Sequence, residues 1–116
     1  MYKIIEVEGD LIEMTLNGEF DVIAHGCNCF NTMGGGIAKS ISNKWKEVYE
    51  KDCETKKGDY NKLGTLTTCP VLIEIDQKFK LVYILNCYTQ YYYGNNKNII
   101  YADYDAIAMC MNKINY

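Results

Sequence analysis

The stretch Asp21-Val22-Ile23-Ala24-His25-Gly26-Cys27-Asn28-Cys29-Phe30-Asn31-Thr32-Met33-Gly34-Gly35-Gly36-Ile37-Ala38-Lys39 decides the fold of this chain. It starts with an apolar strand at residues 22–24, continues through a polar, thiol-rich turn at 25–31, and ends in three glycines before a helix. Glycines carry no Cβ, so a ligand can touch the main chain, and the N-terminus of a helix attracts anions. The stretch predicts a phosphate or diphosphate site, with a glycine-rich turn that binds nothing as the alternative.

The composition indicates one soluble domain. The chain has 116 residues, 48% of them hydrophobic, and a net charge of −3. This charge does not favour a nucleic-acid partner. There is no apolar run of the ~20 residues needed to cross a bilayer, so no membrane partner is expected. The N-terminus lacks the apolar core of a signal peptide, and we expect a cytoplasmic protein, in the host cytoplasm if a phage encodes it.

Six cysteines raise the question of a disulfide framework or a zinc site. Without a secretory signal the expected compartment is reducing. No Cys-x-x-Cys pair occurs, and His25 is the one histidine, so the spacing of zinc ligands is missing. We therefore expect no metal and no cofactor. Cys69 and Cys87 lie in apolar runs that predict small core residues.

The first half of the chain predicts two strands and a long helix. Residues 2–7 are a β-rich run, and Asp10 can cap a short helix. Residues 22–24 predict a buried, parallel strand. Residues 37–51 predict one helix, because Ile37, Ile41, Trp45 and Val48 repeat with a helical period.

The second half predicts a strand-rich segment followed by a helix. Residues 53–63 are polar and predict a loop. Strands are expected at 64–69, 71–75 and 79–84, with Pro70 ending the first or lying at a sheet edge. Residues 101–115 predict a helix with one face formed by Tyr104, Ile107, Ala108 and Met111.

Strands that alternate with helices predict an α/β fold with a parallel or mixed sheet. In such sheets ligands bind at the carboxyl ends of the strands. The loops at 25–36 and 86–94 both lie at the carboxyl end of a predicted strand, where a ligand is expected to bind.

Three motifs resemble one known family. They are Glu8-Gly9-Asp10-Leu11, the run 25–38, and Asn86-Cys87-Tyr88-Thr89-Gln90. In this order they are similar to the macro domain, an ADP-ribose-binding module, and to its branch of ADP-ribose-1″-phosphate phosphatases with phage and bacterial homologues. The resemblance implies a three-layer α/β/α fold with a mixed, mostly parallel sheet.

The resemblance also implies roles for individual residues. Asp10 would accept a hydrogen bond from the adenine amine, with Leu11 beside it. Asn28 would meet the distal ribose, and the main chain of 33–38 would hold the diphosphate. His25 would be the catalytic acid–base group. The residues that the resemblance implies for ligand binding are Gly9, Asp10, Leu11, Asn28, Thr32, Met33, Gly34, Gly35, Gly36, Ile37, Ala38, Thr89 and Gln90.

Each of these residues also has a purely structural interpretation. Asp10 can cap a turn, and His25 can be a buried, neutral, hydrogen-bonded imidazole. Asn28 and Asn31 can satisfy backbone groups of their own loop. The tyrosines at 91–93 can pack against the body of the protein or stack on a nucleobase.

The sequence departs from the family pattern in two respects. The family usually continues past the equivalent of Tyr116 with a strand, a second glycine-rich phosphate loop, another strand and a final helix. The alternatives are a fragment of a longer product, a homodimer that completes the sheet, or a reduced fold with another use. In addition, Gln90 stands where one deglycosylating branch has a nucleophilic lysine, which disfavours a lysine-dependent hydrolase.

The leading functional hypothesis is an enzyme that binds ADP-ribose or a related nucleotide and hydrolyses ADP-ribose-1″-phosphate. The alternatives are an ADP-ribosyl hydrolase, a reader or phage sponge that binds a nucleotide without turnover, and a degenerate domain that serves dimerisation.

Overall fold

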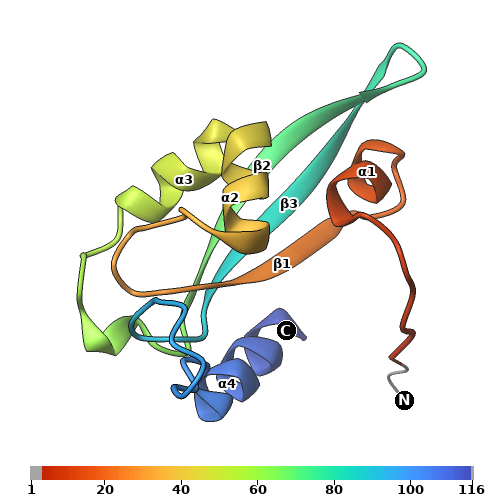
Figure 1. Ribbon diagram of the computed structural model, residues 1–116. Coiled ribbons are helices and arrows are strands. Elements are labelled where there is room, and N and C mark those ends of the chain that lie inside the picture. Colours follow the sequence, from red (N-terminus) through yellow and green to blue (C-terminus); the bar gives the residue numbers. More distant parts are fainter. Residues whose placement is uncertain (1–3, 116) are drawn as a thin grey trace.

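The computed structural model describes residues 4–115, in which helices flank a three-stranded sheet (Figure 1). The strand order is β1-β3-β2; β1 and β3 are parallel, and β2 and β3 form an antiparallel hairpin. The elements in chain order are α1 (Leu11–Leu16), β1 (Val22–Cys27), α2 (Gly36–Lys44), α3 (Lys46–Cys53), the 3₁₀ helix η1 (Tyr60–Lys62), β2 (Leu66–Ile75), β3 (Lys78–Tyr88) and α4 (Tyr104–Ile114).

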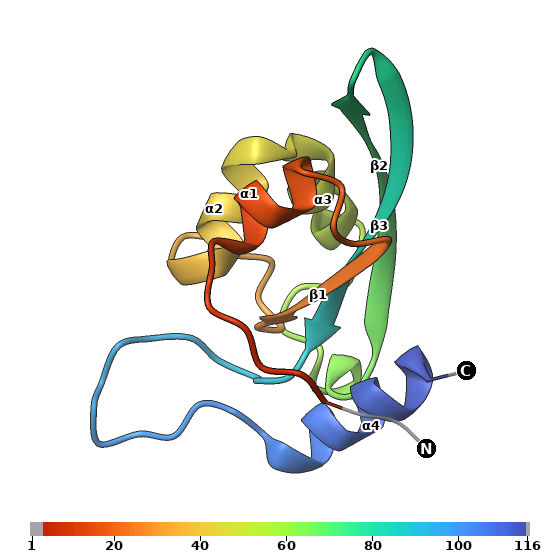
Figure 2. The ribbon, with the colours of Figure 1, turned by 90° about the vertical axis from the view of Figure 1, so that its right-hand side faces the viewer.

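The core lies between the sheet and α1, α2 and α3, which gather on one side of it (Figure 2). Ile41 and Val48 of these helices share the main core with Val82, Ile84 and Tyr88 of β3. On the opposite face, Cys110 of α4 packs with Leu85 and Cys87. The alternation of side chains along β3 therefore supports helices on both faces, and the expected layered α/β fold with a mixed sheet is confirmed.

The strand β1 pairs with β3 in parallel as predicted, but it is not fully buried. Its exposure alternates along the strand, with Ile23, His25 and Cys27 facing the core and Val22 facing outward. Among the described residues β1 has a strand neighbour on one side only. The strand also runs on to Cys27, so His25 lies in a strand and not in the predicted turn.

The predicted strand at 2–7 is wrong over its described part. Residues 4–7 form no strand, and Ile4 is 96% exposed. Residues 2 and 3 lie outside the described part of the chain. A β-rich sequence needs a neighbour for its ladder, and residues 4–7 have none among residues 4–115.

The predicted helix at 37–51 is two helices. Trp45 has extended backbone angles (φ −129°, ψ 92°) that end α2 and precede α3. The predicted core positions Ile41, Trp45 and Val48 are buried, whereas Ile37 is exposed at the start of α2. The periodicity predicted the burial of Trp45 but did not reveal that the helix breaks at this residue.

The hairpin strands are longer than predicted. The strand β2 passes through Pro70 without a break, because it lies at a sheet edge, where the N–H that proline lacks has no ladder partner to lose. The connection at Asp76 and Gln77 has positive φ at both residues (51° and 65°). Two-residue turns with this geometry match the twist of the flanking strands. The predicted core cysteines Cys69 and Cys87 are both buried.

The face assigned to the last helix is wrong. The buried residues of α4 are Ala106 and Cys110, whereas Tyr104 and Met111 are exposed. Asp103 sets the start of the helix, since its Oδ1 accepts a hydrogen bond from the Ala106 N–H at 3.0 Å. Cys110 packs with Leu85 and Cys87 of β3 in place of the predicted stripe.

Candidate functional site

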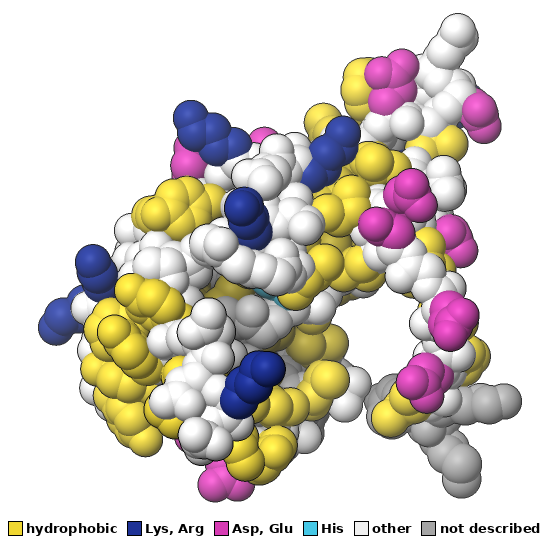
Figure 3. All heavy atoms as spheres, viewed as in Figure 1, with side chains coloured by type: hydrophobic (Ala, Val, Ile, Leu, Met, Phe, Trp, Pro, Cys, Tyr) yellow, Lys and Arg dark blue, Asp and Glu magenta, His cyan; other side chains and the backbone are white. Residues whose placement is uncertain are grey.

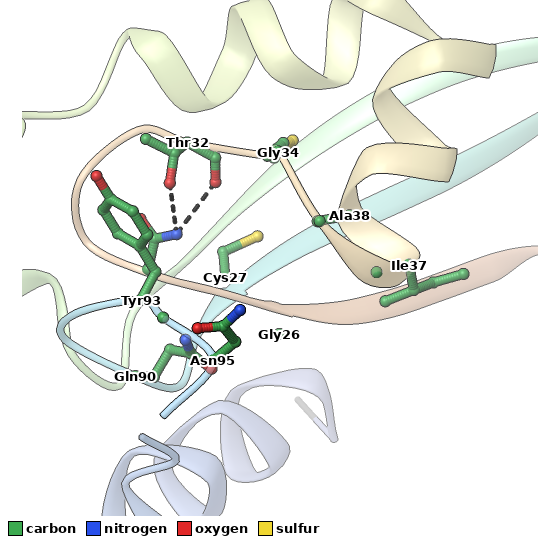
Figure 4. A pocket seen from close by; sticks show the side chains of 14 residues that line it. Gly26, Cys27, Thr32, Gly34, Ile37, Ala38, Gln90, Tyr93 and Asn95 are labelled. Carbon is green, nitrogen blue, oxygen red and sulfur yellow. Dashed lines mark hydrogen bonds between the residues drawn. The ribbon is translucent and has the colours of Figure 1, made fainter. Parts of the chain in front are cut away.

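A cavity of about 670 Å³ lies at the carboxyl ends of β1 and β3. The two loops that were predicted to lie at strand ends both contribute to it, one from β1 to α2 and one after β3. Its lining residues are Gly26, Cys27, Asn28, Thr32, Met33, Gly34, Gly35, Gly36, Ile37, Ala38, Gln90, Tyr93, Gly94 and Asn95 (Figure 4).

The glycine-rich wall of this cavity leads into the N-terminus of α2. Gly35 caps the helix without any side-chain hydrogen bond, so the first N–H groups of α2 have no side-chain cap. A Cβ added at Gly34, Gly35 or Gly36 would meet no protein atom within 4 Å. Packing within the protein therefore does not require glycine at 34 or 35, whereas the φ of +56° at Gly36 favours it.

The loop that precedes the glycines is held by its own side chains. Asn28 Nδ2 donates to the Thr32 carbonyl at 3.1 Å and to Thr32 Oγ1 at 2.8 Å (Figure 4). Asn28 Oδ1 accepts from the Phe30 N–H at 2.8 Å. The structural interpretation of Asn28 thus holds, although the residue also lines the cavity. Its predicted contact with a ribose stays a prediction.

A buried lysine supports the same loop from beneath. Lys62 is 7% exposed, and its Nζ donates to the Cys29 carbonyl at 3.2 Å and to Asn31 Oδ1 at 2.8 Å. The ammonium also lies 4.7 Å from the centre of the Tyr88 ring, which is within the range of a cation–π interaction. Lys62 therefore fixes the turn where Asn31 adopts a φ of 57°.

A buried carboxylate completes this polar layer. Asp52 Oδ1 accepts a hydrogen bond from the Tyr88 hydroxyl at 2.7 Å. Its other oxygen has no hydrogen-bond partner among the described residues. Burial raises the pKa of Asp52 above its ordinary value, and the hydrogen bond from Tyr88 opposes that shift.

His25 lies beside the cavity and not in its lining. The imidazole is 6% exposed, and its Nε2 lies 2.6 Å from Asn86 Oδ1. Asn86 Nδ2 donates to the Val48 carbonyl at 3.2 Å, so Asn86 Oδ1 is the acceptor and His25 Nε2 carries the proton. Burial lowers the pKa of His25, which favours a neutral ring with a free lone pair on Nδ1.

Cys27 lies between this imidazole and the cavity. Its Sγ is 3.8 Å from both ring nitrogens of His25, and the residue lines the cavity. Burial raises the pKa of the Cys27 thiol well above its ordinary value, so the group is a thiol at neutral pH. The structure matches the structural interpretation of His25 in Sequence analysis, and its catalytic role stays a prediction.

The glycine-aspartate-leucine motif lies outside the cavity lining. Asp10 caps α1, since its Oδ1 accepts from the N–H groups of Ile12 at 2.9 Å and Glu13 at 3.1 Å. Gly9, Leu11 and Thr89 are likewise absent from the lining, whereas Gln90 is part of it. The ligand contacts expected of Asp10, Gly9, Leu11 and Thr89 stay predictions.

Sequence reasoning did not assign ligand contacts to Gly26, Cys27, Gly94 or Asn95, all of which line the cavity. The rule that ligands bind at the carboxyl ends of strands was the signal that could have found them. Gly26 and Cys27 end β1, and the other two lie in the loop after β3.

Basic and acidic side chains lie on different parts of the molecular face shown in Figure 3. Lysine side chains lie over the helices on the left of this view, and acidic side chains follow the N-terminal segment and the hairpin on the right. The lysines of α2 and α3 are Lys39, Lys44, Lys46 and Lys51. The helix α3 also carries Glu47, Glu50 and Asp52, so these lysines are largely balanced by carboxylates of the same layer.

Residues 4–115 form neither a cluster of metal-ligating side chains nor a membrane-spanning helix. No group of three or more His, Cys, Asp or Glu side chains comes together there in a way that could hold a metal ion. None of the described helices is long and apolar enough to cross a membrane.

Comparison with known proteins finds similar sequences in a phage and a yeast. An uncharacterized 17.5 kDa protein of Enterobacteria phage T4 is 33% identical over 110 residues, which cover 94% of this chain and 64% of that protein. The ADP-ribose 1''-phosphate phosphatase of Debaryomyces hansenii is 31% identical over 100 residues, which cover 78% of this chain and 56% of the yeast protein. No family model matches the chain.

Solved structures from Bacteroides thetaiotaomicron share the fold. One, a protein of unknown function, is 25% identical with a TM-score of 0.52 over 82% of this chain and 57% of its own. A second is 26% identical with a TM-score of 0.50 over 80% of this chain and 57% of its own. The chain thus spans between half and two thirds of the length of each protein that it resembles.

Proposed function

We propose that this chain is macro-domain-like, binds a nucleotide of the ADP-ribose type in the glycine-rich cavity, and removes the phosphate of ADP-ribose-1″-phosphate. The name of the yeast relative supports this substrate class. The single observation that carries the proposal is the wall formed by Gly34, Gly35 and Gly36. It faces open space at the start of a helix that no side chain caps.

The wall suits a diphosphate for two reasons. The uncapped N–H groups at the start of α2 are donors, and the helix dipole adds a positive partial charge there. The missing Cβ atoms leave room for phosphate oxygens to approach the main chain. Hydrogen bonds from N–H groups to a charged acceptor are each worth roughly 1.5–3 kcal/mol, so several of them can hold a diphosphate.

The proposed reaction is attack of water on the phosphorus of the 1″-phosphate. The bond between phosphorus and the ribose oxygen breaks, the ribose keeps that oxygen as a hydroxyl, and inorganic phosphate leaves. A neutral His25 with a free Nδ1 has the protonation state of a general base. To serve as one it must reach the cavity past Cys27, so the reaction requires the Cys27 side chain to move aside.

A second candidate function is binding without turnover. Among the lining residues, only Cys27 and Tyr93 carry ionisable side chains, and the lining contains no carboxylate. A site that binds phosphates through the main chain alone suits a reader or a nucleotide sponge. The reaction and the binding are therefore tested separately.

The binding test compares a methyl group added in the wall with a hydroxyl removed outside it. Gly34→Ala places a Cβ in the wall, and Ser40→Ala changes an exposed residue of α2 outside it. Because no protein atom opposes the new Cβ, we expect the melting temperature to change little. Calorimetry should show ADP-ribose binding about tenfold or more weaker for Gly34→Ala and unchanged for Ser40→Ala. Absence of wild-type binding would refute the proposal.

The turnover test measures phosphate release from ADP-ribose-1″-phosphate. Wild-type protein should release phosphate, and His25→Gln should bind the substrate but release phosphate at least 100-fold more slowly, the usual scale of general acid–base catalysis. Thermal melting of the variant verifies that the core is intact. Binding without any release by the wild type would favour the reader or sponge, and equal rates would exclude a catalytic His25.

A further inference from the structure

The loop that follows β3 brings a free side-chain amide into the glycine-rich cavity. Three amides line this cavity, those of Asn28, Gln90 and Asn95. Asn28 Nδ2 uses its two hydrogens on Thr32, at 3.1 Å to the carbonyl and 2.8 Å to Oγ1. Gln90 Nε2 donates to the Tyr92 carbonyl at 2.9 Å, which leaves it one hydrogen. The Asn95 amide makes no hydrogen bond to another residue drawn in Figure 4, so both of its hydrogens are available to a ligand.

The backbone on each side of Asn95 is held by Tyr101. The Asn96 N–H donates to the Tyr101 hydroxyl oxygen at 3.3 Å. A Cβ added at Gly94 would collide with the same hydroxyl, so glycine lets Tyr101 approach the main chain here. The Asn96 side chain turns back onto its own loop, where its Oδ1 accepts from the Asn98 N–H at 3.0 Å. These contacts place Asn95 before a ligand arrives, so little ordering is needed when one binds.

Asn95 lies at the end of the cavity where the proposed reaction takes place. In Figure 4 its side chain points toward Gly26 and Cys27, and Gly34 lies on the opposite side of Cys27. The Cys27 thiol in turn separates the cavity from the His25 imidazole, 3.8 Å away. A phosphate that reacts next to His25 therefore lies on the Asn95 side of Cys27, apart from a diphosphate at the glycine-rich wall.

The donors at this end of the cavity carry no charge. Among the described residues that line the cavity, none is a lysine or an arginine. Recognition of a phosphate beside Cys27 therefore falls to neutral N–H groups, which bind charged oxygens less strongly than an ammonium or guanidinium group does. Such donors suit a group that must be bound as part of the substrate and then released as free phosphate.

We propose that Asn95 binds the 1″-phosphate of the substrate and makes the site select ADP-ribose-1″-phosphate over ADP-ribose. This inference rests on the proposed function. The N–H groups at the start of α2 hold the diphosphate, and the Asn95 Nδ2 group donates to the oxygens of the phosphate that leaves. Asn95 is thus a specificity-determining residue, and the cavity has separate places for the diphosphate and for the phosphate that is removed.

The experiment compares two ligands that differ by one phosphate, ADP-ribose-1″-phosphate and ADP-ribose. Asn95→Ala removes the amide, and Asn95→Asp replaces it with a carboxylate that repels phosphate. Asn98→Ala and Asn98→Asp make the same changes at an exposed asparagine of the same loop outside the cavity lining. Calorimetry measures binding in the His25→Gln background, where turnover is expected to be slow. The KM for phosphate release is measured with His25 in place.

The parent chain should bind ADP-ribose-1″-phosphate more tightly than ADP-ribose. Asn95→Ala should weaken the binding of ADP-ribose-1″-phosphate about tenfold or more, the usual effect of losing hydrogen bonds to a charged group, and Asn95→Asp should weaken it further. The binding of ADP-ribose to Asn95→Ala should stay within about twofold of the parent. Both Asn98 variants should bind the two ligands as the parent does, and KM should change in parallel. Thermal melting verifies that each variant is folded.

Other outcomes separate the inference from the proposed function. If Asn95→Ala binds ADP-ribose-1″-phosphate as tightly as its parent, the inference is overturned and the proposed function stands. An equal loss for both ligands places Asn95 against a part that they share, which also overturns it. A loss in Asn98→Asp as large as in Asn95→Asp reduces the effect to long-range charge, with the same consequence. No binding of either ligand by the wild type overturns the function and the inference together.

Discussion

At the scale of single residues, the chemistry of this protein is concentrated in a few buried polar side chains. His25 donates from Nε2 to Asn86 and is packed away from water. Lys62 and Asp52 are buried under the loop that leads to the glycines. Hydrogen bonds within the protein satisfy His25 and Lys62, whereas one oxygen of Asp52 has no partner among the described residues, and an unpaired buried polar atom costs roughly 1–3 kcal/mol.

His25 predicts a pH dependence of stability. Its folded pKa lies below its unfolded value of about 6.5 because burial disfavours the charged ring. As the pH falls below about 6.5, the unfolded chain gains a proton that the folded chain does not, so stability falls by at most about 1.4 kcal/mol per pH unit. Above pH 6.5 this contribution is fully present.

Urea unfolding between pH 7.5 and 5 measures this slope. As the one histidine of the chain, His25 makes a clean comparison, and His25→Gln should lose the slope near pH 6. Asp52 acts in the opposite direction, because its raised pKa makes stability fall as the pH rises above its unfolded value. An identical slope in His25→Gln would contradict this assignment.

Lys62 predicts a coupled loss of stability and binding. Lys62→Met removes one of the two donors to the Cys29 carbonyl, which keeps the Gly58 N–H, and one of the two donors to Asn31 Oδ1, which keeps the Thr55 hydroxyl. The loss of these two charged hydrogen bonds should lower the free energy of unfolding by about 1–3 kcal/mol. The loop at 28–32 should also loosen and weaken ADP-ribose binding. Lys57→Met, at an exposed lysine of the same region, is the control. Denaturation and calorimetry on both variants provide the measurement, and unchanged stability in Lys62→Met would contradict the role.

At the scale of elements, turns and caps decide where helices and strands begin and end. Asp10 and Asp103 set the starts of α1 and α4 through hydrogen bonds to backbone N–H groups. The helices α2 and α3 both start without a side-chain cap, but the start of α2 lines the cavity. Its uncapped N–H groups are the ones that the proposed function assigns to the ligand.

The hairpin turn predicts a stabilising substitution. Gln77 has a φ of 65°, a region that costs a non-glycine residue roughly 1 kcal/mol. Relief of this strain in Gln77→Gly should raise the free energy of unfolding by about 0.5–1 kcal/mol. The greater conformational entropy of glycine in the unfolded chain reduces this gain. Glu74→Gly in β2, where no positive φ occurs, should destabilise. Chemical denaturation of both variants tests the pair, and destabilisation by Gln77→Gly would refute the argument.

At the scale of the whole molecule, apolar surface remains on the sheet. The helix α4 covers Leu85 and Cys87, whereas Val22, Leu81 and Tyr83 stay exposed. Within residues 4–115, the strand β1 has a free edge beside this surface. Free strand edges with apolar neighbours are templates for pairing with another chain.

We therefore expect the chain to self-associate through β1, in line with the homodimer considered in Sequence analysis. Ala24→Lys places a charge on the exposed face of β1 and should shift the protein toward monomer. Ser42→Lys on α2 adds the same charge away from the strand edge. Light scattering over a range of concentrations measures the mass, and a wild type that stays monomeric throughout would rule out this interface.

The sequence by itself determined the fold class, the parallel pairing of β1, the cap that Asp10 forms on α1, and the glycine-rich wall. These features depend on local chemistry, namely β-branched runs, capping carboxylates and missing Cβ atoms, which a sequence displays directly. It also placed the loops after β1 and β3 at the carboxyl ends of strands, where ligands bind in α/β sheets.

Only the tertiary structure decided which side chains reach the cavity. The family resemblance implies ligand contacts for Asp10 and a catalytic role for His25, and both stay predictions, whereas the structure shows that Asp10 caps α1 and that His25 is buried beside Cys27. Tyr93, one of three adjacent tyrosines, is the member that lines the cavity. Strand register, the break at Trp45 and long-range packing set these positions, and none of them is encoded in a local pattern.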